Sequence, residues 1–244
     1  VLADKSDKRV RSIKDIEHIP NFACNIAIPA TQDIGETSIT KYVHTNSSSH
    51  LTEAIRSLYV ELESIKGAPR ILTFHSSHQN DGKTTIATLM AAVMAKAGRR
   101  VVLIDANLRR PAIANAMRKS AGATLVEYLS GHKALEDVLV RDKETGIDVI
   151  FAQSVPNSAF NILSSKKMKS LITALRDQYD LVIIDTPPFT EVADAKMLAR
   201  LSDRNVYIVN RKNATYDTVQ NAMKYFHDIP RGSLEIVLNF AKKK

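Results

Sequence analysis

Hydrophobic residues follow two different periods along this chain, and both become regular after about residue 50. From Leu51 onwards apolar side chains recur every three or four positions, and the same spacing returns over residues 86–94. This period gathers apolar side chains on one side of a helix, so the sequence predicts two amphipathic helices there. Gly67 and Pro69 are expected to end the first helix, and Gly98 the second.

Short apolar runs of strand length stand between and after the helical segments. They are RILTFHSS, RRVVLIDAN, IDVIFA, DLVIIDTPP, NVYIVN and LEIVLNF, at residues 70–77, 99–107, 147–152, 180–188, 205–210 and 234–240. Continuous apolar runs are typical of parallel strands that are buried on both faces, whereas half-exposed strands alternate. The predicted fold is therefore α/β: a doubly wound, mostly parallel sheet with helices on both faces.

The first fifty residues lack this regularity. They are charged at the start, contain Pro20 and Pro29, and end in the polar cluster TNSSSH at 45–50, which we interpret as a linker. The expected organisation is a segment of residues 1–50 followed by a domain of residues 51–244. The polar opening predicts no signal peptide, and the sequence has no apolar run of the roughly eighteen residues that a membrane span needs.

Composition narrows the chemistry only in part. A single cysteine, Cys24, excludes an internal disulfide, and we interpret it as a small buried side chain because no activating group stands near it. The formal net charge of +8 favours an anionic partner, such as a nucleotide, a nucleic acid or a membrane surface. Composition does not choose among these partners.

The stretch SSHQNDGKTT follows the first apolar run and precedes a predicted helix, which is the context of a phosphate-binding loop. In the pattern G-x-x-x-x-G-K-[ST], Ser77 takes the place of the first glycine, while Gly82, Lys83 and Thr84 match. Backbone N–H groups of such a loop hold phosphates at the positive end of the helix. We expect Lys83 to neutralise the β- and γ-phosphates, the Thr84 hydroxyl to bind Mg²⁺, and Thr85 to reach the α-phosphate.

Two aspartates end predicted buried strands. Asp105 closes VVLID and Asp185 closes LVIID, and ligands of doubly wound sheets bind beside the carboxyl ends of the strands. Asp185 is interpreted as the Walker B aspartate. Asp105 is placed to hold Mg²⁺ through water or to accept a proton from an attacking hydroxyl. Asn107 lies two residues after Asp105 and carries no charge.

These motifs together resemble the cytoplasmic kinase domain of the bacterial tyrosine kinases (BY-kinases) in the polysaccharide copolymerase family, an exopolysaccharide chain-length regulator family. The similar segments are VVLIDANLRRP, GATLVEYLSG, VPNSAFNILSSKKM and YDLVIIDTPPFTEVADAKMLA, and serine or alanine also occupies the position of Ser77 in that family. The opening DKRVRSIKDIEHIPNFACNIAIP is similar to the stretch that follows the second membrane span there. The resemblance implies a deviant P-loop NTPase fold, with residues 1–50 as a juxtamembrane segment of a longer chain.

The resemblance also implies an activity: ATP- and Mg²⁺-dependent protein-tyrosine autophosphorylation that regulates exopolysaccharide or capsule polymerisation and export. The implied catalytic residues are Lys83, Asp105, Asp185 and Arg109, and the implied metal ligands are Thr84, Asp105 and Asp185. The implied nucleotide contacts are Ser77, Asn80, Asp81, Gly82, Lys83, Thr84, Thr85, Arg211 and Asn239, with adenine near Asn239.

Partners and location follow from the same resemblance. It implies a homo-oligomer, such as a ring, formed through the predicted helix that carries Glu53 and Arg56. It further implies contact with a membrane-spanning part of the same or a partner chain and with polysaccharide export machinery, at the cytoplasmic side of the bacterial inner membrane. No nucleic acid partner is expected.

The chain departs from that family's pattern at several positions. Asn107 replaces a second aspartate, and its amide oxygen can bind Mg²⁺ but cannot act as a base. Residues 79–81 replace the usual proline, glycine and glutamate, and Tyr59 replaces the second arginine of the oligomerising E-x-x-R-x-x-R pattern. No tyrosine follows Tyr225, whereas these kinases usually end in a tyrosine cluster.

Two alternatives therefore stay open. The first is a catalytically weak or silent ATP-binding scaffold of the same machinery, which Asn107, Tyr59 and the absent tyrosine cluster favour. The second is a partition or septum-positioning ATPase, whose binding to DNA or membrane would explain the basic charge. That class has a signature lysine at the position of His78, and a mostly neutral histidine substitutes poorly for a permanent charge.

Overall fold

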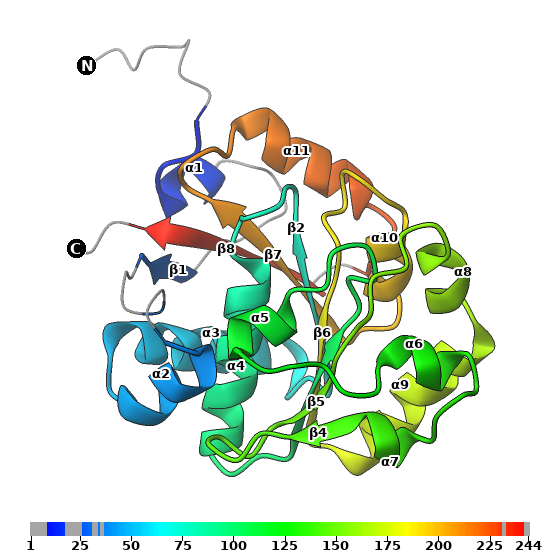
Figure 1. Ribbon diagram of the computed structural model, residues 1–244. Coiled ribbons are helices and arrows are strands. Elements are labelled where there is room, and N and C mark those ends of the chain that lie inside the picture. The colour runs from blue at the N-terminus through cyan, green and yellow to red at the C-terminus, as the bar shows by residue number, and fades with distance from the viewer. Residues whose placement is uncertain (1–8, 18–25, 31–33, 35–36, 231–232, 242–244) are drawn as a thin grey trace, which may run out of the picture.

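A mixed eight-stranded sheet forms the centre of the molecule in a computed structural model that describes residues 9–17, 26–30, 34, 37–230 and 233–241 (Figure 1). The strand order is β1-β8-β7-β2-β6-β3-β5-β4, and every neighbouring pair is parallel except β4 with β5. The strands are β1 (Ile26–Pro29), β2 (Ile71–Ser76), β3 (Val101–Asp105), β4 (Leu139–Arg141), β5 (Asp148–Ile150), β6 (Leu181–Asp185), β7 (Arg204–Asn210) and β8 (Leu234–Ala241). This confirms the predicted doubly wound, mostly parallel α/β fold.

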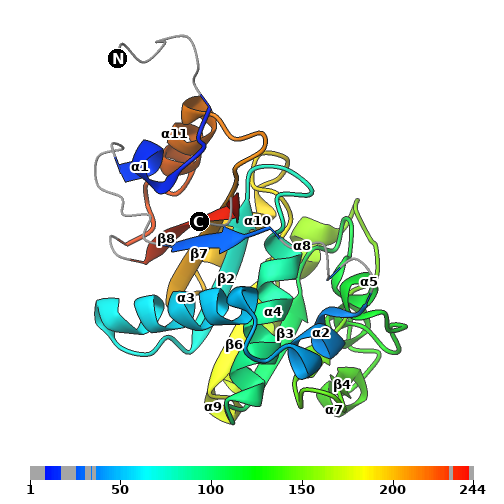
Figure 2. The same cartoon turned by 90° about the vertical axis from the view of Figure 1, so that its left-hand side faces the viewer.

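Helices cover both faces of this sheet. Figure 2 shows α2, α3 and α4 together on one face, and their buried side chains form one hydrophobic cluster with the strands. The helices are α1 (Ile13–Glu17), α2 (Ile39–Thr45), α3 (His50–Lys66), α4 (Lys83–Lys96), α5 (Ile113–Met117), α6 (Leu125–Leu129), α7 (Leu135–Val138), α8 (Ala159–Leu163), α9 (Lys166–Gln178), α10 (Asp194–Ala199) and α11 (Tyr216–Tyr225). Two further clusters, which include residues of α9, α10 and α11, cover the opposite face.

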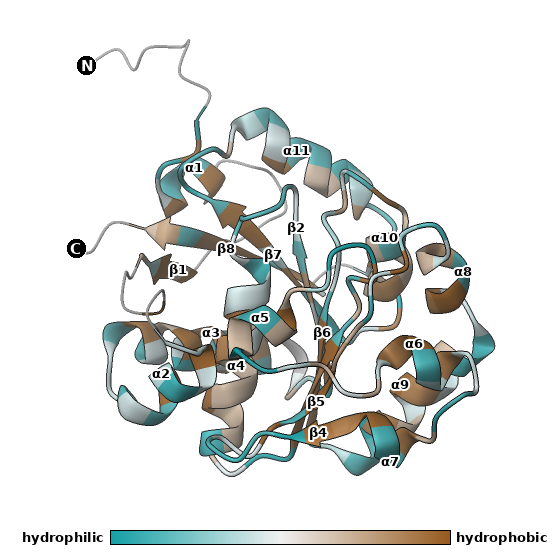
Figure 3. Cartoon of the chain, viewed as in Figure 1, coloured by the Kyte–Doolittle hydropathy of each residue, from teal (hydrophilic) through white to brown (hydrophobic). Residues whose placement is uncertain are grey.

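Alternation along the strands divides the core between the two faces. On β2, Leu72 and Phe74 pack into the cluster that contains α4, whereas Ile71 belongs to the cluster on the other face. The His75 ring lies against Phe226, just after α11, with 4.9 Å between ring centroids. Figure 3 shows the central strands as largely hydrophobic. The sheet is thus buried on both sides, as its continuous apolar runs predicted.

The polar cluster at residues 45–50 is a tight turn between two helices in the structure. Asn46 donates its backbone N–H to the Tyr42 carbonyl at the end of α2, and Ser49 caps α3 by accepting the N–H of Thr52. Strand β1 also joins the sheet, with Ile26 in register with Val237 of β8. Segments before residue 50 therefore pack on the sheet, and we could not foresee this from their irregular hydrophobic pattern.

Some expectations fall on residues outside the described part. Cys24 and Pro20 both lie there, as does the charged opening of residues 1–8. Among the helices that the structure does describe, none combines the length and the hydropathy needed to cross a bilayer.

Candidate nucleotide-binding site

The last position of the loop between β2 and α4 strongly favours glycine. Gly82 has a φ of 93°, in the left-handed region, and a Cβ there would lie 2.1 Å from the Asn239 side-chain nitrogen. That nitrogen donates to the Asp81 carbonyl at 2.8 Å, so the end of β8 holds the loop in place. The positive φ and the close approach of Asn239 both favour glycine at position 82.

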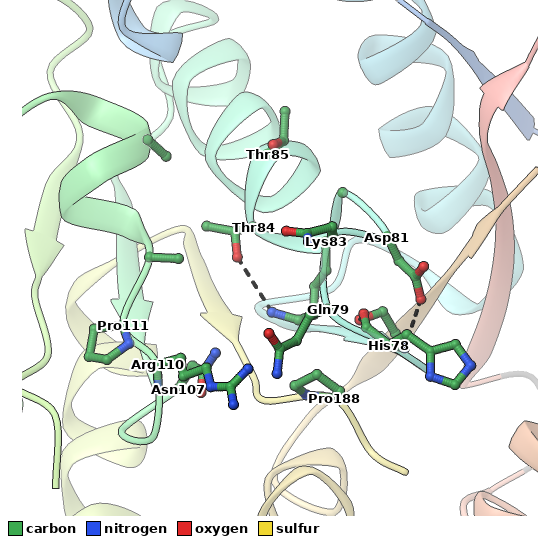
Figure 4. Close-up of a pocket in the computed structure, with 15 residues that line it drawn as sticks. His78, Gln79, Asp81, Lys83, Thr84, Thr85, Asn107, Arg110, Pro111 and Pro188 are labelled. Carbon is green, nitrogen blue, oxygen red and sulfur yellow. Dashed lines mark hydrogen bonds between the residues drawn. The ribbon is translucent and has the colours of Figure 1, made fainter. Parts of the chain in front are cut away.

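A cavity of about 360 Å³ opens in front of this loop. It lies between the loop and the segment after β3, and Figure 4 shows Arg110 and Asn107 on one side with Gln79 and Lys83 on the other. The lining residues are Ser76, His78, Gln79, Asn80, Asp81, Gly82, Lys83, Thr84, Thr85, Asn107, Arg110, Pro111, Ala112, Ala116 and Pro188. Its position at the carboxyl ends of the parallel strands is where doubly wound sheets bind ligands.

One carboxylate gathers the two groups expected to meet phosphate and magnesium. Lys83 donates its Nζ to Asp185 Oδ1 at 2.6 Å, and Thr84 donates its hydroxyl to Asp185 Oδ2 at 2.7 Å. The Asp185 side chain is fully buried at the end of β6, and Lys83 is almost fully buried. Lysine, threonine and aspartate are the side chains that a phosphate loop and a Walker B strand contribute to a Mg²⁺–nucleotide site.

Asp105 is the direct neighbour of Asp185 in the sheet, because the two residues pair in register at the ends of β3 and β6. It is fully buried and accepts the backbone N–H groups of Asn107, Ala112 and Ile113 at 3.0–3.1 Å. Burial raises the pKa of the Asp105 carboxyl, and the negative charge of Asp185 adds to this effect. In this arrangement Asp105 shapes the loop that follows it, while Asn107 lines the cavity.

Ser77 lies beneath the loop rather than in the cavity lining. It is buried and hydrogen-bonded to the Tyr207 hydroxyl on β7. Asp81 is also buried, and its Oδ2 accepts the backbone N–H of His78 at 2.8 Å. Burial raises the pKa of the Asp81 carboxyl. These two side chains therefore stabilise the loop conformation, which presents Asn80 in the left-handed region at a φ of 62°.

Arg109, one of the residues expected at the site, has its side chain beside α10 in the structure. Its Nε donates to Asp194 Oδ2 at 2.9 Å and its Nη1 to the Pro156 carbonyl at 3.0 Å, so the guanidinium is held beside α10. Its neighbour Arg110 lines the cavity instead. The cause is the buried carboxylate of Asp194, which draws one of two consecutive arginines away. The pair RRP in the sequence indicated an arginine at the site but not which one.

Arg211 and Asn239 do stand at neighbouring strand ends. The Arg211 N–H donates to the Asn239 carbonyl at 3.1 Å, but the Arg211 Nε donates to the Arg11 carbonyl and points to the N-terminal segment. Asn239 lines a second cavity of about 190 Å³, which shares Gly82 and Thr85 with the first. The rest of its lining is apolar: Ile28, Pro29, Ile34, Leu51, Ile86, Leu89 and Phe240.

Sequence reasoning missed several contributors to the first cavity. Pro188 and Ala112 line it without belonging to a recognised chemical motif. The Gln79 amide donates to Glu191 Oε1 at 3.1 Å, which ties the tip of the phosphate loop to the segment after β6. Residue spacing in the sequence gives no signal for the Gln79–Glu191 contact, because the two residues lie far apart in the chain.

Comparisons with known proteins agree with this geometry. The family described as AAA domain matches residues 70–235. The tyrosine-protein kinase YwqD of Bacillus subtilis is 32% identical over 151 residues, and the match covers 62% of this chain and 64% of that protein. The tyrosine-protein kinase etk of Escherichia coli K12 is 34% identical over 157 residues, which cover 64% of this chain and 22% of that protein. The matches thus span less than two thirds of these relatives.

Solved structures extend the likeness to almost the whole chain. The kinase domain of the Escherichia coli tyrosine kinase ETK superposes with a TM-score of 0.86 at 26% identity, covering 96% of each chain. The septum site-determining protein MinD of Pyrococcus horikoshii, complexed with Mg-ADP, gives a TM-score of 0.57 at 20% identity over 68% of this chain and 67% of that one. The second likeness shows the fold alone.

Family match, relatives and fold agree with the motifs quoted from the sequence. The chain belongs to the AAA-domain family, and it is similar to bacterial tyrosine-protein kinases.

Proposed function

We propose that the chain binds ATP with Mg²⁺ in the cavity before the phosphate loop and transfers the γ-phosphoryl group to tyrosine. The observation that carries the proposal is the contact of Asp185 with both Lys83 and Thr84, at a strand end in register with Asp105. Two relatives of the chain are tyrosine-protein kinases, which supports tyrosine as the acceptor of the phosphoryl group.

The residues present fit a nucleotide. Glycine at position 82 lets the loop pass close to the Asn239 side chain, and the N-terminus of α4 adds its positive end where phosphates would bind. Lys83 would exchange its bond with Asp185 for one with the β- and γ-phosphates. The apolar cavity beside Asn239 and Phe240 suits a nucleobase.

Thr84 and Asp185 would hold Mg²⁺, with Asp105 behind them. When bound, the ion supplies positive charge that offsets the charge on the transferred group. Lys83 and Arg110 would stabilise the same charge from the protein side, since both line the cavity. Asp105 would accept the proton of the tyrosine hydroxyl, a role that its raised pKa favours.

Calorimetry with ATP and Mg²⁺ tests the nucleotide assignment. The wild-type chain should bind ATP, and Lys83→Met should lose affinity because the phosphates lose their cationic partner. Arg141→Met is a matched control, since Arg141 pairs with Asp148 on an exposed edge away from the cavity. Equal affinity in the wild type and Lys83→Met would remove the phosphate-loop assignment.

A silent scaffold is the second candidate. Asn107 lines the cavity in the place of a family aspartate, and Asp105 is held by three backbone N–H groups. A protein with this site could bind ATP and change its assembly without transferring phosphate. ATP binding without phosphotyrosine, in the presence of a membrane-spanning partner, would favour this candidate over the kinase.

We also propose self-association through α3. Glu53 and Arg56 are exposed on this helix and form an ion pair with each other, while Val60 nearby is 62% exposed. Tyr59 is buried, with the Arg99 guanidinium 5.0 Å from its ring centre, so it does not extend this surface. The partner in this contact would be a second copy of the chain. The other proposed partners, at the cytoplasmic side of the inner membrane, are a membrane-spanning part of the same or a partner chain and the polysaccharide export machinery.

Sedimentation at high protein concentration with nucleotide tests this contact. The wild type should sediment as a large oligomer. Arg56→Ala should dissociate it, because in the oligomer Arg56 would pair with a carboxylate of the neighbouring copy instead of Glu53 of its own helix. Arg141→Ala serves as the control for loss of one exposed arginine. A strictly monomeric wild type would exclude the proposed assembly.

A further inference from the structure

A third cavity, with a polar lining, lies at the opposite end of the sheet from the phosphate loop. It has a volume of about 410 Å³ and is lined by Arg70, Arg176, Asp203, Arg204 and the turn at 67–69. Strand β2 begins beside it at Ile71 and runs six residues to Ser76, just before the phosphate loop. At about 3.3 Å per residue the two cavities are roughly 20 Å apart. This cavity is therefore separate from the proposed nucleotide site.

Positive charge dominates its lining, because three guanidinium groups face one carboxylate. That carboxylate is largely occupied: Asp203 Oδ2 accepts the backbone N–H groups of Arg70 and Ile71 at 3.0 and 2.9 Å. Its other oxygen lies 3.4 Å from Arg176 Nη2. Asp203 thus offsets the charge of one arginine, Arg176. The residues that line the cavity keep an excess of two positive charges.

Arg204 is the least compensated of the three arginines. Only 6% of the residue is exposed, and its Nη1 donates to the Asp203 carbonyl at 2.9 Å. Within the described part of the chain, its Nε and Nη2 are buried and have no hydrogen-bond partner. A buried cation with unpaired donors is costly unless an anion compensates it, and arginine is well suited to bind planar or tetrahedral oxyanions through two N–H groups.

From this arrangement we infer that the cavity is a binding site for a phosphate-type oxyanion. Arg70 and Arg176 supply the accessible donors, and Arg204 supplies fixed positive charge behind them. Arg70 is already positioned, because its Nη1 donates to the Arg176 carbonyl at 3.1 Å. The competing explanation is that the arginines only offset the negative ends of α3 and α9, which terminate here at Lys66 and Gln178.

Titration of the full chain with inorganic phosphate, followed by NMR of the Gly67 and Ala68 amides, tests the inference. Their position in the cavity lining separates this site from phosphate binding at Gly82 and Thr84. The expected result is a saturable shift of both amides at constant ionic strength. Arg176→Gln should weaken the response about tenfold or more, because one charge-assisted contact is lost.

Arg100→Gln is the matched control, since Arg100 is an exposed arginine with its own carboxylate partner, Asp180. This variant should leave the titration unchanged. Arg176 is 48% exposed, so its replacement should leave the fold intact, which replacement of buried Arg204 would not ensure. The inference is overturned if neither amide shifts saturably, or if Arg176→Gln responds like the wild type.

Vesicles distinguish the two sources of the anion. If the group belongs to a lipid, vesicles of phosphatidylglycerol should compete with phosphate for the wild type, and vesicles of phosphatidylcholine should not. If it belongs to a soluble phosphate compound, neither vesicle should compete. Because the readout is local to residues 67–68, failure here would leave the nucleotide proposal intact, and loss of ATP binding in Lys83→Met would leave this one intact.

Discussion

Lys83 and Asp185 form a buried ion pair, with 2.6 Å between Lys83 Nζ and Asp185 Oδ1. The lysine comes from the first turn of α4 and the aspartate from the end of β6, so the pair joins the phosphate loop to the sheet. A buried ion pair contributes little net stability, but removing one partner leaves the other charge uncompensated. The same contact therefore serves the fold and keeps the lysine at the cavity.

Because the pair is buried, removing one of its charges should cost more stability than removing both. Lys83→Met should lower the free energy of unfolding by about 3 kcal/mol because Asp185 stays buried without its cation. The double variant Lys83→Met with Asp185→Asn should recover a large part of that loss, since no unpaired charge is left. Urea unfolding of the two variants and the wild type measures this. Equal stability of the single and double variants would contradict the account of the pair.

Gly82 and Gly98 offer a matched test of the close approach at the phosphate loop. Both have a positive φ, so alanine at either position should cost about 1–2 kcal/mol in backbone strain. Only at Gly82 would the new Cβ also meet Asn239; nothing lies within 4 Å at Gly98. Gly82→Ala should therefore lose more stability and also ATP affinity, measured by urea unfolding and calorimetry. Equal losses of stability in both variants would exclude the steric role of Asn239.

Glu235 at the start of β8 should make stability depend on pH. Burial raises its pKa from 4.5 to about 7, and the charge of Glu61 adds to the shift. The folded chain therefore holds this proton to higher pH than the unfolded chain, so stability falls as pH rises from about 4.5 to 7. A shift of this size corresponds to roughly 3 kcal/mol.

The test compares urea unfolding of the wild type and Glu235→Gln at pH 5 and pH 8. The variant should lose less stability between these values, because it has no proton to release there. Glu61→Gln should give an intermediate slope, since it removes only the neighbouring charge. If Glu235→Gln follows the wild-type slope, burial of Glu235 does not control this dependence.

Asp105 and Asn107 separate loop geometry from proton transfer. Asp105→Asn keeps the size of the side chain and one of the two oxygens that accept backbone N–H groups, and it removes the base, so phosphoryl transfer should fall about 10²–10⁴-fold. Asn107→Asp should keep or raise activity because it restores an anionic ligand in the cavity. ATP affinity from calorimetry is the control for both. Full transfer activity in Asp105→Asn would refute its role as the base.

The sequence predicted the strands and helices that local hydrophobic patterns reveal. Asp105 and Asp185 each close an apolar run, as the sequence indicated, and the structure adds that the two strands are neighbours with these residues in register. The choice of Arg110 over Arg109 was not predictable, because it depends on the buried carboxylate of Asp194. Likewise, the Gln79 contact with Glu191 joins two loops that are distant in sequence. Local patterns predict strand ends, and long-range packing decides which side chains reach the cavity.

Phosphotyrosine formation with radiolabelled ATP is the most direct test of the proposed kinase function. It should be measured on this chain alone and together with a membrane-spanning partner segment, with Lys83→Met as the inactive control. We predict label on tyrosine in at least one of the two conditions for the wild type, and none for Lys83→Met. Clear ATP binding with no phosphotyrosine in either condition would contradict the kinase and leave the scaffold.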